Sequence, residues 1–184
     1  MRFTKTRLGT AAATLCALAL VAGLAAPAAR AADQAREAVG LFVQSCLKHV
    51  EDPQDLLAWI DATPQLRRFA PKQAQAFLEG KKGDVWSAEN DAGLFALVLF
   101  ADNSCQVLAQ QASADQVSLV FSEYVRRKGL PLNKIGDRRD YVRSIDERTE
   151  TWRSASGFPY EVVVKTSKSP RADAQAVLTT LPNR

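Results

Sequence analysis

Residues 93–109 read GLFALVLFADNSCQVLA, and this stretch decides the fold. The apolar run 94–101 is too short to span a membrane and is typical of a strand buried on both faces. Asp102 and Asn103 then predict a tight turn. After the turn the residues alternate, with Cys105 on the apolar side, as in a strand that buries one face. The stretch therefore predicts two neighbouring strands joined by a short turn.

Amphipathic helices are predicted before these strands. Apolar residues recur at steps of three and four through residues 33–50, which favours a helix facing a core. Pro53 suits the first turn of a short second helix over 53–61, and residues 71–79 predict a third. After a loop bounded by glycines, the spacing of the apolar residues no longer fits a helix, and residues 84–87 are predicted to begin the first strand. Three strands in a meander are expected here.

One more helix and another strand are predicted after the meander. Ser113 and Gln116 fit a capping box, and Gly129 ends the helix that they begin. The charged stretch that follows predicts a loop over 134–148, which leads into a strand at 149–154.

The last part of the chain is rich in β-branched residues. Residues 158–166 predict a strand, and residues 175–181 predict either a last strand or a short helix, of which the strand is favoured. We therefore expect an α+β domain in which N-terminal helices pack on a mostly antiparallel sheet. The expected order after the helices is strand-strand-strand-helix-strand-strand, with a possible last strand.

The first 31 residues have the layout of a secretory signal peptide. They contain no acidic residue, three basic residues near the start, a long apolar run, and small residues before a cleavage site placed after Ala31. A membrane anchor is the alternative, because the run is about long enough to span a bilayer. Leu15, directly before Cys16, argues against lipidation. We expect a cleaved signal at 1–31, a single domain at 32–184, and a periplasmic or secreted protein without a stable membrane anchor.

Cleavage would remove four basic residues, so that residues 32–184 carry 20 basic and 20 acidic residues and no net charge. The basic character of the whole chain therefore gives no reason to expect a nucleic-acid partner. The charge is uneven, with a net −6 over 32–125 and +6 over 126–184. Two mutually attracting parts of one domain are the favoured interpretation, and a basic face for an acidic partner is the alternative.

Two cysteines remain after the predicted cleavage. An even count in an exported protein predicts a disulfide between Cys46 and Cys105, which would close a loop of about 60 residues and stabilise the fold by roughly 4 kcal/mol. Free structural thiols are one alternative. A reactive Cys46 with His49 three residues later is another, since positions three apart lie on one side of a helix.

Recognised catalytic motifs are missing from the sequence. There is no phosphate-binding loop, dinucleotide-binding glycine motif, HExxH, GxSxG or CxxC, and the chain has a single His. One His is too few for a typical zinc site. We therefore expect no catalytic, cofactor-binding or metal-ligating residue, and no cofactor.

Two weaker patterns offer chemistry without a motif. Asp84 with Glu89 or Asp91 is a carboxylate pair of the kind that glycoside hydrolysis uses, although acidic residues near a turn are common. Trp86 and Trp152, if they lie on neighbouring strands, would form an aromatic platform for a ligand. Core packing is the favoured interpretation of both tryptophans.

Three short motifs resemble a family of small exported proteobacterial proteins and lipoproteins of unknown function. They are FVQSCL at 42–47, GDVW at 83–86, and an apolar strand that leads to CQV at 105–107. The resemblance covers residues 40–125 and implies an exported α+β domain with a Cys pair. It implies no activity and no catalytic residue.

The compact exported domain without a catalytic motif favours a binding or protein-interaction module rather than an enzyme. Its partner would be an unknown envelope protein, as for an inhibitor or immunity-type protein, or a small ligand. An exported hydrolase that acts through carboxylates on an envelope substrate is the alternative. Thiol chemistry at Cys46 and His49 is a third possibility.

Overall fold

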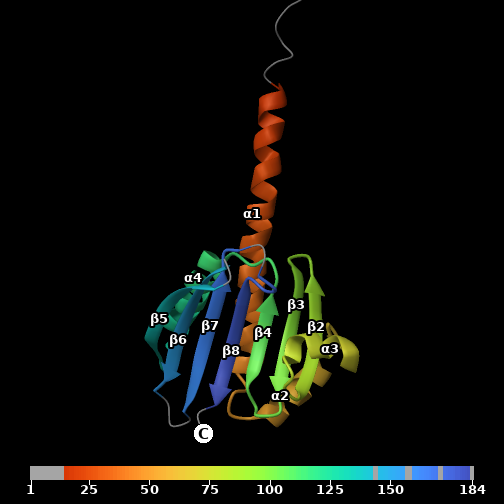
Figure 1. Cartoon of the computed structure of the whole chain (residues 1–184), viewed down its shortest axis with the longest axis vertical. Helices are drawn as coiled ribbons and strands as arrows, with labels where there is room; N and C mark the ends of the chain where they lie inside the picture. The colour runs from red at the N-terminus through yellow and green to blue at the C-terminus, as the bar shows by residue number, and fades with distance from the viewer. Residues whose placement is uncertain (1–14, 143–144, 156–158, 170–171, 183–184) are drawn as a thin grey trace, which may run out of the picture.

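An antiparallel sheet of eight strands organises the part of the chain that the structure describes, in the order β1-β2-β3-β4-β8-β7-β6-β5 (Figure 1). The computed structural model describes residues 15–142, 145–155, 159–169 and 172–182. The strands are β1 (Leu66–Arg68), β2 (Gly83–Asn90), β3 (Gly93–Phe100), β4 (Cys105–Ala109), β5 (Leu132–Val142), β6 (Ile145–Ser154), β7 (Tyr160–Ser167) and β8 (Ala176–Pro182). The helices are α1 (Leu15–Phe42), the π-helical turn η1 (Val43–Leu47), α2 (Pro53–Asp61), α3 (Pro71–Leu78) and α4 (Ala114–Lys128). The expected α+β class is confirmed.

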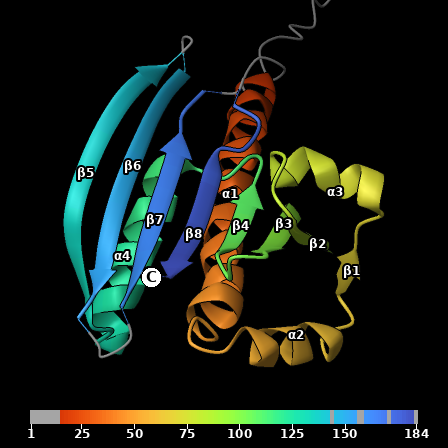
Figure 2. The same cartoon turned by 60° about the horizontal axis from the view of Figure 1, so that its bottom comes forward.

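The sheet consists of two similar halves. In each half a helix is followed by an antiparallel meander, and the last strands of the two meanders, β4 and β8, pair antiparallel at the centre. Val107 lies opposite Leu178 in this pair. Helix α1 packs on β4 and β8, and α4 packs beside α1 and on β7 (Figure 2). Both helices therefore lie over the seam between the halves and the strands next to it.

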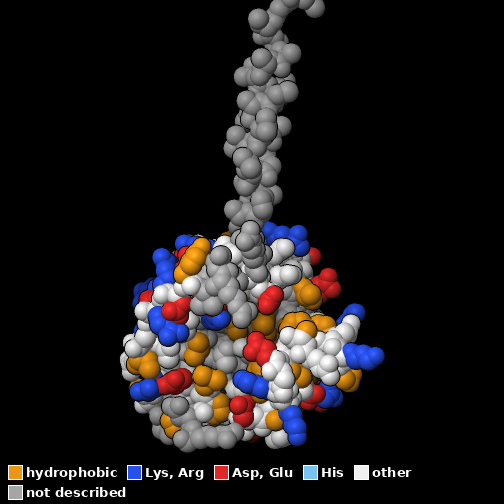
Figure 3. Space-filling model, viewed as in Figure 1, with side chains coloured by type: hydrophobic (Ala, Val, Ile, Leu, Met, Phe, Trp, Pro, Cys, Tyr) orange, Lys and Arg blue, Asp and Glu red, His pale blue; other side chains and the backbone are white. Residues whose placement is uncertain are grey.

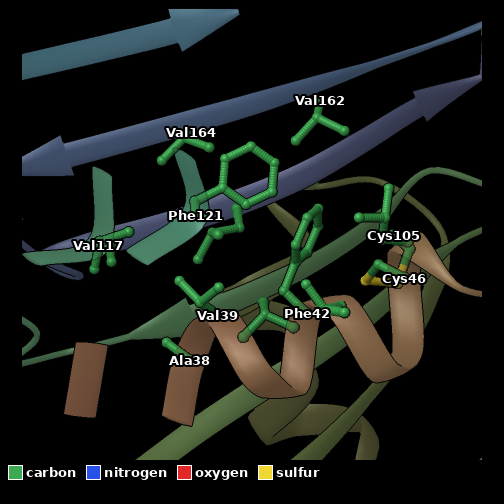
Figure 4. Close-up of a cluster of buried hydrophobic side chains, with 14 of the residues drawn as sticks. Ala38, Val39, Phe42, Cys46, Cys105, Val117, Phe121, Val162 and Val164 are labelled. Atoms are coloured by element: carbon green, nitrogen blue, oxygen red, sulfur yellow. A yellow bond between two sulfur atoms is a disulfide. The ribbon is translucent and has the colours of Figure 1, made fainter. Parts of the chain in front are cut away.

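The main core fills the space between these two helices and the sheet. Phe42 of α1 meets Phe121 of α4 edge-on, with ring centroids 6.0 Å apart, and both side chains are fully buried (Figure 4). Val107 and Leu178 from the central strands lie beneath them. Because side chains alternate along a strand, the other face of β2 and β3 needs its own cover. Helix α3 supplies this cover through Ala74 and Leu78. These two side chains form a second, smaller core with residues from β2 and β3: Val85, Ala96, Val98 and Phe100.

The predicted disulfide is present. Cys46 in η1 is bonded to Cys105 at the start of β4, with the two Cα atoms 5.3 Å apart. The bond joins the end of the first long helix to the central strand. Because the Cys46 sulfur is bonded to another sulfur, it is not free to act as a nucleophile beside His49, and the hypothesis of thiol chemistry is wrong for this form of the protein.

Two other local predictions are wrong. The charged stretch 134–148 is not a loop, because β5 and β6 form a long hairpin through it. Ser113 precedes α4 as expected, but its side chain makes no capping hydrogen bond, so the capping box does not form. The helix does end at Gly129, which adopts a left-handed conformation with φ of 60°. Strand β1 was not expected, since three residues are too few to produce a periodic signal.

Ion pairs explain how so charged a stretch becomes a hairpin. Glu150 on β6 is almost fully buried, and one of its oxygens lies 2.9 Å from Arg148 and 3.2 Å from Lys134. The same two cations bind Asp137 on β5, at 2.6 Å and 2.7 Å. We call these four residues the β5–β6 ion cluster. Hydrogen bonds from Arg148 and Lys134 hold the pKa of Asp137 well below its usual value.

Among the described residues, no helix has an apolar stretch long enough to cross a membrane.

Replacement of Asp137 by Asn should reduce the loss of unfolding free energy that the protein shows as the pH falls below about 4. The pKa of Asp137 is lower in the folded protein than in the unfolded chain, where it lies near 4. The ion cluster therefore stabilises the fold above about pH 4, and this contribution is lost as the pH falls towards the lowered pKa. Urea denaturation at a series of pH values measures it. An identical pH profile in both proteins would contradict the assignment.

Loss of the disulfide should cost roughly 4 kcal/mol of unfolding free energy, because the bond restricts a long loop of the unfolded chain. The double variant Cys46→Ser, Cys105→Ser, compared with the oxidised protein by urea denaturation, gives the value. The unaltered protein in reductant is the control, and it should behave like the double variant. A loss below about 1 kcal/mol would mean that the disulfide contributes little.

Candidate functional site

A groove opens on the helix-bearing face of the sheet, beside α1 and over β2. Since α1 lies over the central strands, the half of the sheet formed by β1, β2 and β3 is covered there only at one end, by α2 (Figure 2). The hollow has a volume of about 350 Å³, within the range typical of ligand sites. Its apolar lining comes from α1, α2 and three strands: Gly40, Leu41, Trp59, Leu66, Ala88 and Phe95. We call this hollow the α1–β2 groove.

Helix α1 forms one wall of the groove because two neighbouring stripes of residues run along it, one facing the core and one facing the groove. The residues of one stripe, including Val39 and Phe42, face the core. The residues on the neighbouring stripe recur at the same helical spacing and line the groove: Arg36, Glu37, Gly40, Leu41 and Gln44. One helix thus serves both the core and the groove.

Gly40 widens the groove near the C-terminal end of α1, where the helix continues into η1. A Cβ built on this residue meets nothing within 4 Å, so packing does not require a glycine at this position. Glycine inside a helix costs about 0.5–1 kcal/mol relative to alanine. Close packing does not explain why α1 carries a glycine at position 40 despite this cost. The effect of Gly40 on the structure is the space that it leaves at the groove wall.

Trp59, which lines the groove, also packs against the ring of His49. Its ring lies 6.1 Å from the ring of His49, measured between centroids. The Nδ1 atom of His49 is 2.7 Å from the Oδ2 atom of Asp55, and the His49 side chain is almost fully buried. Thr63 donates a hydrogen bond to the carbonyl oxygen of Trp59 at 2.7 Å. The Asp55–His49 pair therefore fixes the position of the indole rather than forming a separate site.

The helix that carries Trp59 begins at a well-formed cap. The side chain of Asp52 accepts hydrogen bonds from the backbone N–H groups of Gln54 and Asp55, at 2.9 Å and 3.1 Å. Pro53 occupies the first turn, as the sequence predicted. The start and direction of α2 are fixed by this cap, and with them the position of Trp59, seven residues after Asp52.

The polar rim of the groove combines free amides with charges that are already paired. In the described part of the chain, the side-chain amides of Gln44 and Gln65 form no hydrogen bond and face solvent. Arg36 forms an ion pair with Asp33. Glu37 accepts a hydrogen bond from the side chain of Asn90 at 3.2 Å. The lining therefore carries one positive and one negative charge, each with a partner.

A second, more open hollow of about 530 Å³ continues the groove towards the turn between β2 and β3. It shares Arg36, Glu37 and Asn90 with the groove and adds Asp33 and Asp91. Ala29 and Arg30 also line it, and both belong to the segment predicted to be cleaved. Its remaining lining has more acidic than basic side chains, which disfavours an anionic ligand at this end.

The carboxylates proposed for a hydrolase do not converge. Asp84 forms an ion pair with Arg68 across β1 and β2. Glu89 lies five positions further along β2, so that the two side chains point to opposite faces of the sheet. Glu89 lines a separate hollow with Arg67, and Asp91 lies in the turn after β2.

The proposed tryptophan platform is wrong, and both side chains pack in the core. Trp86 on β2 and Trp152 on β6 are separated by four strands, and each is more than nine-tenths buried. Trp152 packs edge-on against Phe121, with ring centroids 5.5 Å apart. Trp59 on α2, which no sequence motif singled out, lines the α1–β2 groove.

The uneven charge along the sequence does not form one basic surface on the face that Figure 3 shows. Basic and acidic side chains are interspersed over both halves there (Figure 3). On the strands, Arg153 pairs with Glu161 at 2.7 Å and Lys165 with Glu147 at 2.9 Å. Both pairs lie within the basic part of the chain, 126–184, and they interrupt a basic surface there. Between the two parts of the chain, Lys168 pairs with Asp115 at 2.8 Å.

The residues that the structure describes contain no group of three or more His, Cys, Asp or Glu side chains that would hold a metal ion. No protein-family model matches the chain, and no curated protein matches it. The resemblance to small exported proteins of unknown function therefore stays a prediction, and the proposal for function depends on the groove.

Gly40→Ala should raise the free energy of unfolding by about 0.5–1 kcal/mol, since the added methyl group meets open space and the helix gains propensity. Gly83→Ala is the matched control, because its Cβ would lie 2.5 Å from the carbonyl oxygen of Leu99 and should destabilise the fold. Urea denaturation measures both. A destabilised Gly40→Ala would show that α1 is closely packed there and that the groove is narrower than described.

Proposed function

We propose that the protein is an exported binding protein whose α1–β2 groove holds a small ligand or a short segment of an envelope partner. The observation that carries this proposal is a preformed hollow beside Trp59, in a wall where Gly40 leaves room. Sites for small ligands are typically concave and largely apolar, with a few polar groups that set orientation. The apolar floor and the amides of Gln44 and Gln65 supply these two parts.

The lining favours binding over hydrolysis. Aromatic, aliphatic and amide side chains bind and orient a ligand without reacting with it. Glu37 is the one carboxylate among the side chains lining the groove, and Asn90 holds it by a hydrogen bond. Glycoside hydrolysis through carboxylates ordinarily needs two such groups on either side of the bond to be broken. The hydrolase alternative therefore receives no support from this groove.

Export is supported by the position of the predicted cleavage site. The N-terminal part of α1 projects beyond the sheet (Figure 1). Cleavage after Ala31 would remove one contact with the body of the protein, the hydrogen bond that the carbonyl oxygen of Ala31 accepts from the N–H of Ser113 at 3.0 Å. Gln34 follows as a buried side chain. Removal of residues 1–31 would therefore leave the packed part of α1 in place, and the Cys46–Cys105 bond is compatible with an oxidising compartment.

Blocking the groove should abolish capture of the natural ligand. The full chain, exported by its own N-terminal segment, would be crosslinked in its host envelope and purified with whatever it holds. Gly40→Phe places a ring in the hollow, where nothing lies within 4 Å of the Cβ position. We expect recovery of the bound molecule to fall at least tenfold, a loss of about 1.4 kcal/mol of binding free energy.

Leu119→Phe is the matched control, because it adds a ring to an exposed position of α4, on a different helix from Gly40. It should recover as much ligand as the unaltered protein. Equal recovery from all three proteins would show that the captured molecule binds elsewhere, and the groove would lose its assigned role. Thermal unfolding of each variant checks that the fold is intact.

A further inference from the structure

We infer that the ligand of the α1–β2 groove is an uncharged glycan chain, one sugar ring of which stacks on Trp59. This inference rests on the proposed binding function and names its ligand class. Three properties of the groove carry it: the partly exposed indole, the free amides of Gln44 and Gln65, and a lining without an unpaired positive charge.

The indole supplies a flat apolar surface that is held in one orientation. A sugar ring has an apolar face made of C–H groups and an edge of hydroxyl groups, so it uses both an aromatic surface and hydrogen-bonding groups beside it. Trp59 is held from behind by His49, which Asp55 fixes in turn. A rigid platform of this kind loses little conformational entropy when a ligand binds.

The amides match the hydroxyl edge of such a ring. Each amide of Gln44 and Gln65 offers two N–H donors and an accepting oxygen, and a hydroxyl group also donates and accepts. In the residues that the structure describes, neither side chain forms a hydrogen bond within the protein. Both are therefore available to a ligand that carries donors and acceptors together.

The charges of the groove disfavour an anionic ligand. Arg36 is paired with Asp33, whereas Glu37 keeps its negative charge, because its hydrogen-bond partner Asn90 is a neutral amide. The adjoining hollow adds Asp91 and would repel a carboxylate or phosphate. An acidic glycan should therefore bind poorly, and an uncharged one should bind without a charge to neutralise.

An extended peptide fits the site less well. Peptides commonly bind along a free strand edge, where backbone groups supply the hydrogen bonds. The strand beneath the groove, β2, is paired with β3 along its length and with β1 over residues 86–88. The groove therefore offers a peptide a side-chain surface without a backbone ladder.

The test uses the exported full-chain protein and a defined probe, the neutral tetrasaccharide of N-acetylglucosamine, in isothermal titration. We expect binding of this probe, and at least tenfold weaker binding of an acidic oligogalacturonate of the same length. Trp59→Ala should weaken binding of the neutral probe by about tenfold, and Trp59→Phe by less, since a smaller aromatic surface remains. Tyr141→Ala, which removes an exposed aromatic ring from β5, should leave the affinity unchanged.

Fluorescence gives a second readout, which is measured first on the unaltered protein. The chain has three tryptophans, and Trp86 and Trp152 are buried in the core while Trp59 is partly exposed. Stacking of a sugar should therefore change the emission of the unaltered protein through Trp59. Gly40→Phe, which leaves the indole in place but fills the hollow, should abolish that change.

The outcomes separate the ligand class from the binding function. If the tetrasaccharide does not bind but a neutral tetrapeptide binds and is excluded by Gly40→Phe, the glycan assignment is wrong and the groove is still a binding site. If the acidic oligosaccharide binds as well as the neutral one, the charge argument fails and the assignment to an uncharged glycan is overturned. If no probe binds and Gly40→Phe leaves ligand capture in the envelope unchanged, the proposed function fails as well.

Discussion

The antiparallel pairing of β4 with β8 joins segments about 70 positions apart in the sequence and turns two meanders into one sheet. The contacts of both long helices depend on it, because α1 and α4 bury their apolar stripes side by side over this seam and the strands beside it. The Cys46–Cys105 bond ties the end of the first helix to the same seam. Strand pairing between distant segments carries a large loop-closure cost. The disulfide reduces a different closure cost, that of bringing residue 46 to residue 105.

The position of α1 over the seam has a consequence at the other end of the sheet. A helix is about 10 Å wide, so one helix does not cover several strands. The half formed by β1, β2 and β3 is therefore covered incompletely on the helix-bearing face, and α2 lies across only one end of it. The groove beside Trp59 results from this incomplete cover. Gly40 in α1 and the Asp55–His49 contact behind the indole determine its shape.

The β5–β6 ion cluster shows a different way to stabilise a sheet. A buried carboxylate is costly unless it is paired, and Glu150 is paired with two cations that also bind Asp137 on the neighbouring strand. Charges of both signs thus hold together a hairpin whose sequence is mostly polar. A pattern method expects apolar alternation in a strand and assigns such a stretch to a loop, which is the error made at residues 134–148.

Local chemistry in the sequence was sufficient for several elements of this protein. Helical spacing, the proline at the start of α2, the glycine after α4, the apolar run of β3 and the pair of cysteines each act over a few residues or by simple counting. The fold class and the disulfide follow from them. The order of the strands, the hairpin held by ion pairs and the groove depend on which distant surfaces meet. Gly40, Trp59 and Gln65 come from three separate segments, and only the tertiary structure brings them to one hollow, because no local spacing records where α1 lies on the sheet.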